Sequence, residues 1–328
     1  MGDNLILEVK ELTTTFQSRR QTFHAIDRIS FQVAKGETLG VVGESGCGKS
    51  VTSLSIMGLI KPPGKVTHGQ ILFKGMDLLS LSKHELREIR GNKVSMIFQE
   101  PMTSLNPVYT IGNQISEALK IHTKLNRQQI KERTIELLNM VGIPRAAEII
   151  NDYPHQLSGG MRQRVMIAMA MACKPELLIA DEPTTALDVT IQAQILELIK
   201  ELQIKNDMSM ILITHDLGVV SEVCDRLIVM YAGIIVEQGP VGEILDRPQH
   251  PYTKGLLASL PKNAIDRRLH YIPGQVPPPF EWGKGCRFAD RCSFVMDRCR
   301  QELPPLFSSG AKKHCACWLM EKGGESHD

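Results

Sequence analysis

Three short motifs follow one another along the chain and restrict what it can fold into. A glycine-rich loop occupies residues 43–50, directly after an apolar run. Residues 157–161 have the sequence Leu-Ser-Gly-Gly-Met, and the carboxylate pair Asp181 and Glu182 ends a second apolar run at residues 177–180. Glycine-rich turns expose backbone N–H groups that bind phosphate, and carboxylates at a strand end bind divalent cations. The chain is therefore expected to fold around a phosphate-containing ligand.

Short apolar runs alternate with segments of helical spacing through most of the chain. Helices are expected at residues 49–60 and 190–206 and from Gly159 onward, and residues 108–150 have helical spacing throughout. Strands are expected at residues 5–9, 29–33, 38–42, 94–98, 177–180, 210–214 and 227–231. This alternating order predicts an α/β fold with a mostly parallel sheet and helices on both faces.

Composition excludes several classes of protein. The 328 residues are 42% apolar, which allows a sizeable core. A net charge of +2, from 38 basic and 36 acidic residues, gives no reason to expect nucleic-acid binding. No apolar run approaches the ~18 residues of a membrane span, and the N-terminus has no secretory signal pattern. We expect a cytosolic protein whose connection to a membrane is made through partners.

The loop at residues 43–50 fits the pattern G-x-x-x-x-G-K-[ST] between an apolar strand and a helix. Lys49 is expected to reach the β- and γ-phosphates of ATP, and the Ser50 hydroxyl to bind Mg²⁺. A chance glycine-rich turn is the alternative, which the flanking strand and helix disfavour. Cys47 is expected to be a tolerated small side chain, although a reactive thiol of low pKa is an alternative in an electropositive loop. The expected nucleotide contacts are Gly43, Glu44, Ser45, Gly46, Cys47, Gly48, Lys49, Ser50 and Val51.

The two adjacent carboxylates have separate expected roles. Asp181 is expected to hold Mg²⁺ directly or through water, and Glu182 to orient and polarise the attacking water as general base. A simple strand-to-turn transition is the alternative, but it does not explain two carboxylates after an apolar run. His215 follows another apolar run and is expected at the same edge of the sheet.

Together these motifs resemble the ATP-binding-cassette (ABC) ATPases over roughly the first 240 residues. The resemblance implies an ABC-type nucleotide-binding domain: a mostly parallel sheet core with an antiparallel β subdomain and a helical subdomain. It also implies that Ser158, Gly159 and Gly160 begin a helix whose N-terminus contacts the γ-phosphate bound to another subunit. A chain with one phosphate loop and one such helix must then act as a dimer.

The same resemblance assigns further roles. Gln99 is expected to sense Mg²⁺ and water, and His215 to contact the γ-phosphate. Residues 186–188, including Asp188, match a loop that crosses the dimer interface. Phe16 is expected to stack on adenine, with Phe23 as the competing candidate, and either ring is also compatible with a core position.

Segments outside the general motifs resemble a narrower group. Residues 99–107, 250–253 and 272–277 resemble the ATPase subunits of bacterial dipeptide and oligopeptide importers, and residues 153–195 the dipeptide-type subunit. The resemblance implies an ATP-hydrolysing motor that couples dimer closure to permease alternation, peripheral at the cytoplasmic face of the membrane. It implies as partners a second, different ATPase subunit, two integral permease subunits and an extracytoplasmic peptide-binding protein. The alternatives are an ATPase of a nickel or other small-solute importer and, less favoured, a non-transport ABC ATPase.

Five of the eight cysteines lie between residues 286 and 317. The spacing is C-x5-C-x6-C-x17-C when Cys286, Cys292, Cys299 and Cys317 are the members, and Cys315 is the alternative fourth. Four thiolates can hold a [4Fe–4S] cluster or a structural zinc ion, and free or oxidised thiols are the third alternative. The paired spacing of most zinc sites is absent, and the importer resemblance also favours the iron–sulfur cluster.

We expect an ABC ATPase domain at residues 1–240, with its helical subdomain at about residues 100–157. Residues 241–328 are expected to form a small cysteine-rich C-terminal extension typical of peptide importers. Because every nucleotide motif lies before residue 240, ATP binding by the isolated chain is expected to survive loss of the cluster.

Overall fold

The computed structural model describes residues 4–17, 21–100, 104–185, 187–260, 271–310 and 312–321. Within these ranges no helix combines the length and apolar character needed to cross a bilayer. The chain divides into two compact units. Unit 1 comprises Met1–Ile6, Val33–Glu37 and Asp77–Ile213, and unit 2 comprises Leu7–Gln32, Thr38–Met76 and Thr214–Asp328. Each unit is described by itself.

A parallel sheet forms the centre of unit 1. Its strands β6, β7 and β8 are almost entirely apolar and fully buried, as expected for parallel strands covered on both faces. Val94 pairs with Leu177, and Asp181 pairs with Ile213. The strand bounds are β6 Val94–Ile97, β7 Leu177–Asp181 and β8 Ser209–Ile213. The predicted parallel strands at these positions are confirmed.

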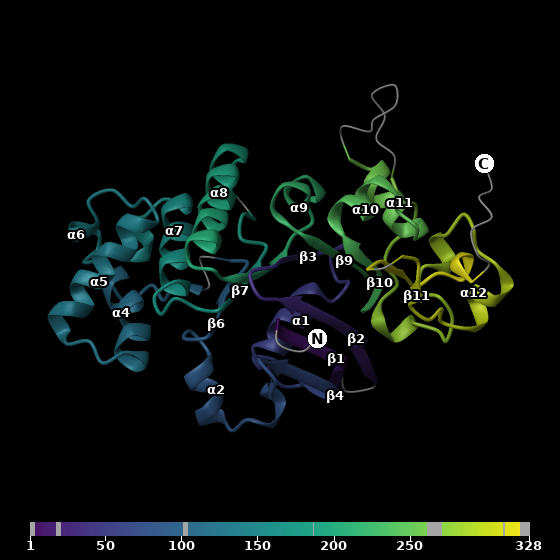
Figure 1. Ribbon diagram of the computed structural model, residues 1–328, viewed down its shortest axis with the longest axis horizontal. Helices are drawn as coiled ribbons and strands as arrows, with labels where there is room; N and C mark the ends of the chain where they lie inside the picture. The colour runs from purple at the N-terminus through teal and green to yellow at the C-terminus, as the bar shows by residue number, and fades with distance from the viewer. Residues whose placement is uncertain are drawn as a thin grey trace. The chain divides into compact units, whose positions relative to one another are not determined.

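Helices make up most of the rest of unit 1, and α4, α5, α6 and α7 lie together (Figure 1). The predicted helix-rich segment at residues 108–150 is confirmed. Side-chain caps define several helix starts: Thr110 caps α4, Asn126 caps α5 and Asp188 caps α8. The helices are α2 Lys83–Ile89, α4 Ile111–His122, α5 Arg127–Met140, α6 Ala146–Ile149, α7 Gly159–Ala170 and α8 Val189–Lys205, with short 3-10 turns at Leu78–Ser80 and Pro154–Gln156.

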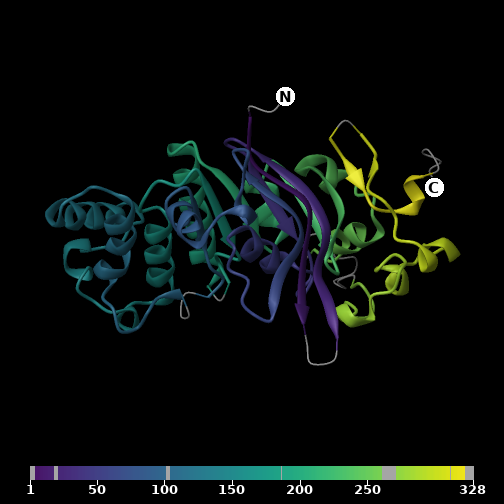
Figure 2. The same ribbon diagram turned by 90° about the horizontal axis from the view of Figure 1, so that it is seen from below.

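Unit 2 contains most of an antiparallel sheet whose long, twisted strands are seen in Figure 2. Strand β1 pairs with β4, so that Leu7 faces Phe73 and Phe16 faces Gly64. In a second sheet β3 runs parallel to β9, and β10 runs antiparallel to β9. The strands are β1 Leu5–Gln17, β2 Thr22–Ala34, β3 Thr38–Val42, β4 Gly64–Phe73, β5 Met76–Asp77, β9 Arg226–Tyr231 and β10 Ile234–Pro240.

Helix α1, Lys49–Ile56, is shorter than the helix predicted at residues 49–60. Gly58 has a φ of 60° and places the chain in the left-handed region. The Gly58 N–H donates to the Ser55 carbonyl, and the Leu59 N–H donates to the Leu54 carbonyl. These two bonds form a glycine-terminated helix end. The glycine, and not the later prolines, therefore ends the helix.

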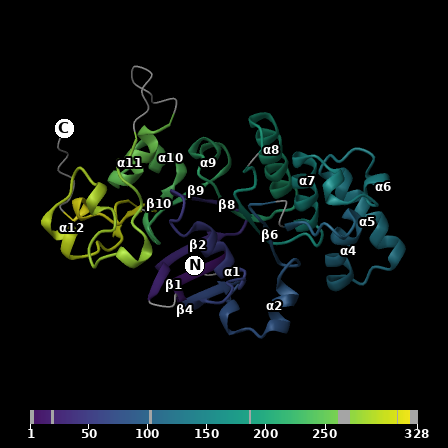
Figure 3. The same cartoon turned by 180° about the vertical axis from the view of Figure 1, so that it is seen from behind.

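The C-terminal part of unit 2 packs around an aromatic cluster. The Tyr231 ring lies 4.6 Å from the Tyr252 ring and 5.2 Å from the Phe288 ring, measured between centroids. Helices α10 and α11 lie beside β10 and the residues after α11 (Figure 3). We call the described residues after α11, 271–310 and 312–321, the C-terminal segment. The remaining elements are α9 Leu217–Val223, α10 Val241–Asp246, α11 Pro251–Ala258, α12 Asp297–Gln301, β11 Phe307–Ser308 and β12 His314–Cys315, with 3-10 turns at Pro279–Glu281, Ala289–Arg291 and Trp318–Met320.

A buried ion pair joins β10 to the C-terminal segment. The Lys313 ammonium lies 3.3 Å from the Glu237 carboxylate, and both side chains are buried. Glu237 also accepts hydrogen bonds from the backbone N–H groups of Gln249 and His250. Lys313 also donates to the Glu243 and Arg247 carbonyls. A buried charge that loses its partner strongly destabilises a fold.

Lys313→Met is therefore expected to lower the free energy of unfolding by about 3 kcal/mol, because it leaves the Glu237 carboxylate buried without a counter-ion. Urea denaturation measures the change. Lys312→Met is the matched control, because Lys312 is exposed. The double variant Lys313→Met, Glu237→Gln should recover part of the loss. Equal stability of the two single variants would show that the pair contributes nothing.

Candidate active site

The glycine-rich loop at residues 43–50 connects β3 to α1 in unit 2. Gly43 has a φ of 153°, and a Cβ there would lie 2.2 Å from the Met230 carbonyl oxygen. Gly48 has a φ of 103°, and a Cβ there would lie 2.9 Å from the Ala25 carbonyl oxygen. Both positions therefore require glycine for conformation and for space. The loop is held against β2 and against the end of β9.

Lys49 points back into this loop. Its ammonium donates to the carbonyl oxygens of Gly43, at 2.7 Å, and Glu44, at 3.2 Å. The side chain is buried, which places a positive charge within the curve of the loop where phosphate oxygens are expected. Ser50 and Val51 follow in the first turn of α1 and are half-buried, whereas Ser45 and Gly46 are exposed.

Cys47 is fully buried beneath the loop. Burial raises the pKa of its thiol above the ordinary value, and the nearby Lys49 charge offsets this only in part. A buried, protonated thiol is a poor nucleophile. The alternative of a reactive cysteine of low pKa is therefore wrong, and Cys47 is a small packing residue.

Residues from the C-terminal part of unit 2 also hold the loop, which sequence reasoning missed. The Glu44 N–H donates to the Tyr252 hydroxyl at 2.9 Å. The Arg291 guanidinium donates to both carboxylate oxygens of Glu44, at 2.8 and 3.2 Å. From the sequence, residues 250–253 indicate only the resemblance to peptide importers. Arg291 lies between Cys286 and Cys292, so the stretch that carries these cysteines also contacts the phosphate loop.

His250 sets the position of Tyr252. Burial lowers the pKa of His250 to about 3, so its ring is neutral at neutral pH. The neutral Nδ1 accepts the Tyr252 N–H at 3.0 Å and caps α11. The fully buried Tyr252 is thereby fixed with its hydroxyl against the loop.

The strand-end carboxylates lie together in unit 1. Asp181 ends β7 and is buried. The Glu182 carboxylate accepts hydrogen bonds from the Gln99 amide, at 3.0 Å, and from the Thr185 hydroxyl, at 2.9 Å. Glu182 has a φ of 45°, a strained conformation for a residue other than glycine. Its N–H donates to Ile213 at the end of β8, which fixes the turn.

Ser158 is the N-cap of α7, and its hydroxyl accepts the Met161 N–H at 3.3 Å. Ser158 and Gly159 are exposed and Gly160 is half-buried, so the start of this helix is open to solvent in unit 1. Asp188 caps α8 by accepting the Ile191 N–H at 3.0 Å. Ala186 lies outside the described residues, as do residues 101–103 of the importer-like segment.

The other expected nucleotide residues lie in unit 2. His215 follows β8 and is exposed. Phe16 and Phe23 are stacked, with ring centroids 6.0 Å apart and planes at 16°. Both rings are half-buried. The two competing candidates thus form a single aromatic pair, in which neither is a fully buried core residue.

Four of the C-terminal cysteines line one cavity in unit 2. These are Cys286, Cys292, Cys299 and Cys317. Burial, followed by the neighbouring cysteines, raises the pKa of Cys286 and of Cys317 to about 11. Cys315 does not line this cavity and is fully buried in β12, beside β10. Among the described residues, no group of three or more His, Cys, Asp or Glu is arranged to hold a metal ion.

A phosphate loop between a buried strand and a helix, with its lysine inside the loop, defines a nucleotide-binding protein of the phosphate-loop class. The carboxylates at the end of β7 add the groups that such proteins use for hydrolysis.

Comparisons with known proteins narrow this class. Residues 26–185 match the family described as ABC transporter, and residues 236–299 match the oligopeptide/dipeptide transporter C-terminal region. The chain is 55% identical over 320 residues to the dipeptide transport ATP-binding protein DppD of Haemophilus influenzae, covering 97% of each. It is 53% identical over 322 residues to the oligopeptide transport ATP-binding protein AppD of Bacillus subtilis, covering 97% of this chain and 98% of the relative.

A solved dimeric ATP-binding cassette, in a post-hydrolysis state with ADP and phosphate, matches with a TM-score of 0.65 at 28% identity, over 72% of this chain and 98% of that chain. The chain belongs to the ABC transporter ATP-binding proteins that carry the oligopeptide/dipeptide transporter C-terminal region. The resemblance stated from the sequence is confirmed, and the protein is an ABC-type ATPase.

Glu182→Gln is expected to lower the rate of ATP turnover by about 10²–10⁴-fold, because an amide does not accept the proton of the attacking water. ATP affinity is expected to persist, since Lys49 and Ser50 are unchanged. Steady-state hydrolysis and equilibrium nucleotide binding test both statements. Glu201→Gln, on the exposed side of α8, is the matched control. Near-normal hydrolysis by the Glu182 variant would contradict the role of general base.

Proposed function

We propose that this chain is the ATP-hydrolysing motor of an importer for dipeptides or oligopeptides, in which closure of an ATPase dimer drives permease alternation. The observation that carries the proposal is identity of more than half of the residues, over nearly the full length, to proteins named for dipeptide and oligopeptide transport. The match of residues 236–299 to a region named for the same transporters supports it independently of the cassette.

The proposed chemistry is Mg²⁺-dependent hydrolysis of ATP. In unit 2, Lys49 and the backbone of the phosphate loop bind the ATP phosphates, and Ser50 binds Mg²⁺. In unit 1, Asp181 offers a carboxylate of the kind that binds Mg²⁺. Glu182 acts as general base, and Gln99, hydrogen-bonded to it, orients the water and senses the cation. His215 contacts the γ-phosphate, and Phe16, with Phe23 stacked on it, supports the adenine. The close pairing of Gln99 with Glu182 favours these two as one functional group.

The proposed active assembly contains a second, different ATPase subunit. In this arrangement Ser158, Gly159 and Gly160 offer the positive end of α7 to the γ-phosphate bound by the partner. Asp188 belongs to the loop that meets the same partner. The exposure of Ser158 and Gly159 supports an intermolecular role.

The proposed complex is completed by two integral permease subunits and an extracytoplasmic peptide-binding protein. The chain itself is placed peripherally, at the cytoplasmic face of the membrane. The helical subdomain, at about residues 100–157 of an ATPase domain spanning residues 1–240, receives the permeases. No partner is proposed to be a nucleic acid, since the net charge is only +2.

Residues 241–328 are proposed as a C-terminal extension that holds a [4Fe–4S] cluster through Cys286, Cys292, Cys299 and Cys317. Their convergence on one cavity supports this ligand set, and the position of Cys315 outside the cavity disfavours it as the fourth ligand. The thiolates of such a cluster each bind a different iron, so they need not be close enough to share one ion. Zinc, the alternative, would require all four to meet at a single ion. When bound, the cluster would cross-link a segment with little core of its own.

The transport proposal is tested by reconstituting the chain with its permeases, second ATPase and binding protein in vesicles. ATP-dependent uptake of a labelled dipeptide is expected. Ser158→Arg should abolish uptake yet leave ATP binding by this chain's own loop, because a bulky cation replaces the hydroxyl at the start of α7. Lys312→Arg is the matched surface control. Uptake of Ni²⁺ but not of peptide would show that the proposed cargo is wrong. Normal uptake by Ser158→Arg would contradict the proposed contact between the start of α7 and the γ-phosphate bound by the partner.

The cluster proposal predicts that anaerobically purified chain is brown, with about four irons and acid-labile sulfide per chain. Cys299→Ser should remove the colour and most of the iron, because one thiolate ligand is lost. Cys315→Ser, which changes a cysteine outside the cavity, should retain both. Stoichiometric zinc without iron in strictly anaerobic protein would overturn the cluster and leave a four-thiolate site.

A further inference from the structure

Two arginines lie next to cysteines of the four-cysteine cavity and contact the phosphate loop or the residues that it packs against. Arg287 directly follows Cys286, and Arg291 directly precedes Cys292. Both guanidinium groups are buried in unit 2, with side-chain exposures of 6% and 7%. We refer to Arg287 and Arg291 together as the arginine clamp. Buried arginines are uncommon and require well-placed acceptors.

Arg291 is the part of the clamp that contacts the loop directly. Its two terminal nitrogens bind the two carboxylate oxygens of Glu44, a bidentate pairing that fixes orientation as well as distance. The same side chain donates to the carbonyls of Ile272 and Pro273 and to the Tyr231 hydroxyl. Arg291 is therefore held on several sides, with Glu44 as its only carboxylate partner among the contacts seen in the described residues.

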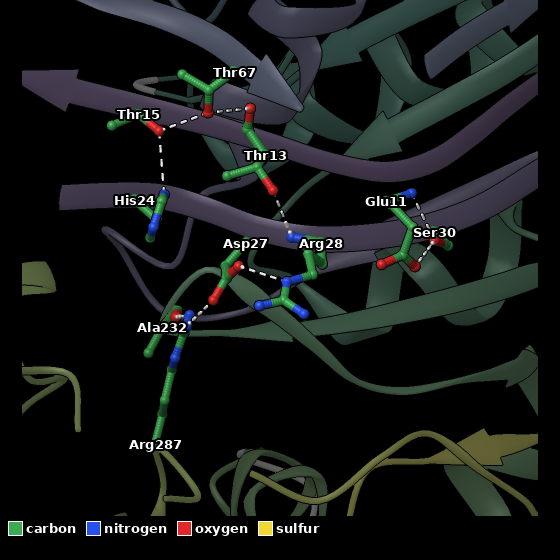
Figure 4. Close-up of polar contacts among 10 residues, drawn as sticks. All are labelled: Glu11, Thr13, Thr15, His24, Asp27, Arg28, Ser30, Thr67, Ala232 and Arg287. Carbon is green, nitrogen blue, oxygen red and sulfur yellow. Dashed lines mark hydrogen bonds and ion pairs between the residues drawn. The ribbon is translucent and has the colours of Figure 1, made fainter. Parts of the chain in front are cut away.

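Arg287 holds the surface against which the loop packs. It donates to the Ala232 carbonyl at 2.6 Å and pairs with Asp27 on β2 (Figure 4). Its guanidinium stacks on the Trp282 ring at 4.1 Å. Gly233, next to Ala232, donates its N–H to the Cys47 carbonyl within the phosphate loop. Arg287 thus supports the turn that holds the middle of the loop.

Other arginines of the same segment do not share this arrangement. Arg300 pairs with Asp290 at 2.8 Å, but the two side chains are 59% and 87% exposed. Arg298 pairs with Glu302 and Glu321, also at the surface. Exposed pairs of this kind contribute little, whereas a buried bidentate pair fixes its partner. The clamp is therefore a specific feature of the residues that flank Cys286 and Cys292.

We propose that Arg291 is a positioning residue for ATP binding, which it acts on through Glu44, and that the arginine clamp couples the four-cysteine cavity to the phosphate loop. The inference rests on the proposed function, in which this loop binds ATP. Any change that loosens Cys286 or Cys292 also moves the adjacent arginine. The phosphate loop then loses the contact that holds Glu44 and the support of the turn at Ala232 and Gly233 that binds the Cys47 carbonyl. ATP binds more weakly as a result.

The first experiment measures equilibrium binding of Mg-ATP to the purified full-length chain. Arg291→Ala is expected to raise the dissociation constant on the order of ten-fold, within the usual range of coupling between two sites. Arg291→Lys, which keeps the charge but loses the bidentate geometry, should give an intermediate value. Arg300→Ala is the matched control and should bind as the unsubstituted chain does. In the assembled transporter Arg291→Ala should raise KM for ATP more than it lowers kcat, because the groups around Glu182 are unchanged.

The second experiment tests the coupling to the cysteine cavity. Cys299→Ser changes a cavity cysteine that is not next to either clamp arginine. It should weaken ATP binding in the unsubstituted chain but add little in the Arg291→Ala background, since the connection is already broken there. Thermal unfolding of each variant identifies those that are folded, and only these are compared. Equal and additive effects in both backgrounds would overturn the coupling.

A reference variant separates this inference from the proposed function. Lys49→Ala removes the cation inside the phosphate loop and should abolish measurable ATP binding. If Lys49→Ala loses binding while folded Arg291→Ala and Arg291→Lys bind as the unsubstituted chain does, the positioning role of Arg291 is wrong and the ATP site stands. If Lys49→Ala also binds normally, the ATP site itself is wrongly assigned.

Discussion

The close packing of the phosphate loop is the constraint on which unit 2 depends. Without room for a Cβ at Gly43 or Gly48, the loop lies directly against the Met230 and Ala25 carbonyls. This contact fixes the path of the backbone through the loop. The conformation of the loop therefore depends on contacts with β2, β9 and the turn after β9. The conformation of the phosphate loop is thus determined by the surrounding fold as much as by its own glycines.

The aromatic cluster of Tyr231, Tyr252 and Phe288 extends this dependence to the C-terminal segment. The cluster brings Phe288, which lies between Cys286 and Cys292, into the same core as β9 and α11. A buried, neutral His250 caps α11 and orients Tyr252, whose hydroxyl accepts a backbone N–H of the loop. Residues of the C-terminal segment therefore contribute to the packing around the phosphate loop.

In unit 1 the parallel sheet brings two expected site residues together. Adjacent strands β6 and β7 end side by side, so Gln99 and Glu182 come within hydrogen-bond distance although they are far apart in sequence. The left-handed conformation of Glu182 turns the chain sharply after the strand. Strain of this kind persists only where the surroundings determine it, here through the bond from Glu182 to Ile213.

The sequence by itself determined the parallel strands and the positions of the phosphate-loop and carboxylate motifs, because each depends on local pattern or on residue type at fixed spacing. Only the tertiary structure showed that Cys286, Cys292, Cys299 and Cys317, and not Cys315, line one cavity. The pattern of residues 49–60 predicts a longer α1 than the structure has, because Gly58 ends the helix ahead of the prolines. Only the tertiary structure brought Arg291 to Glu44, 247 residues away, and Arg287 to Asp27. Such contacts follow from how strands and loops pack in three dimensions. An arginine beside a cysteine carries no local sign of the distant carboxylate that it will meet.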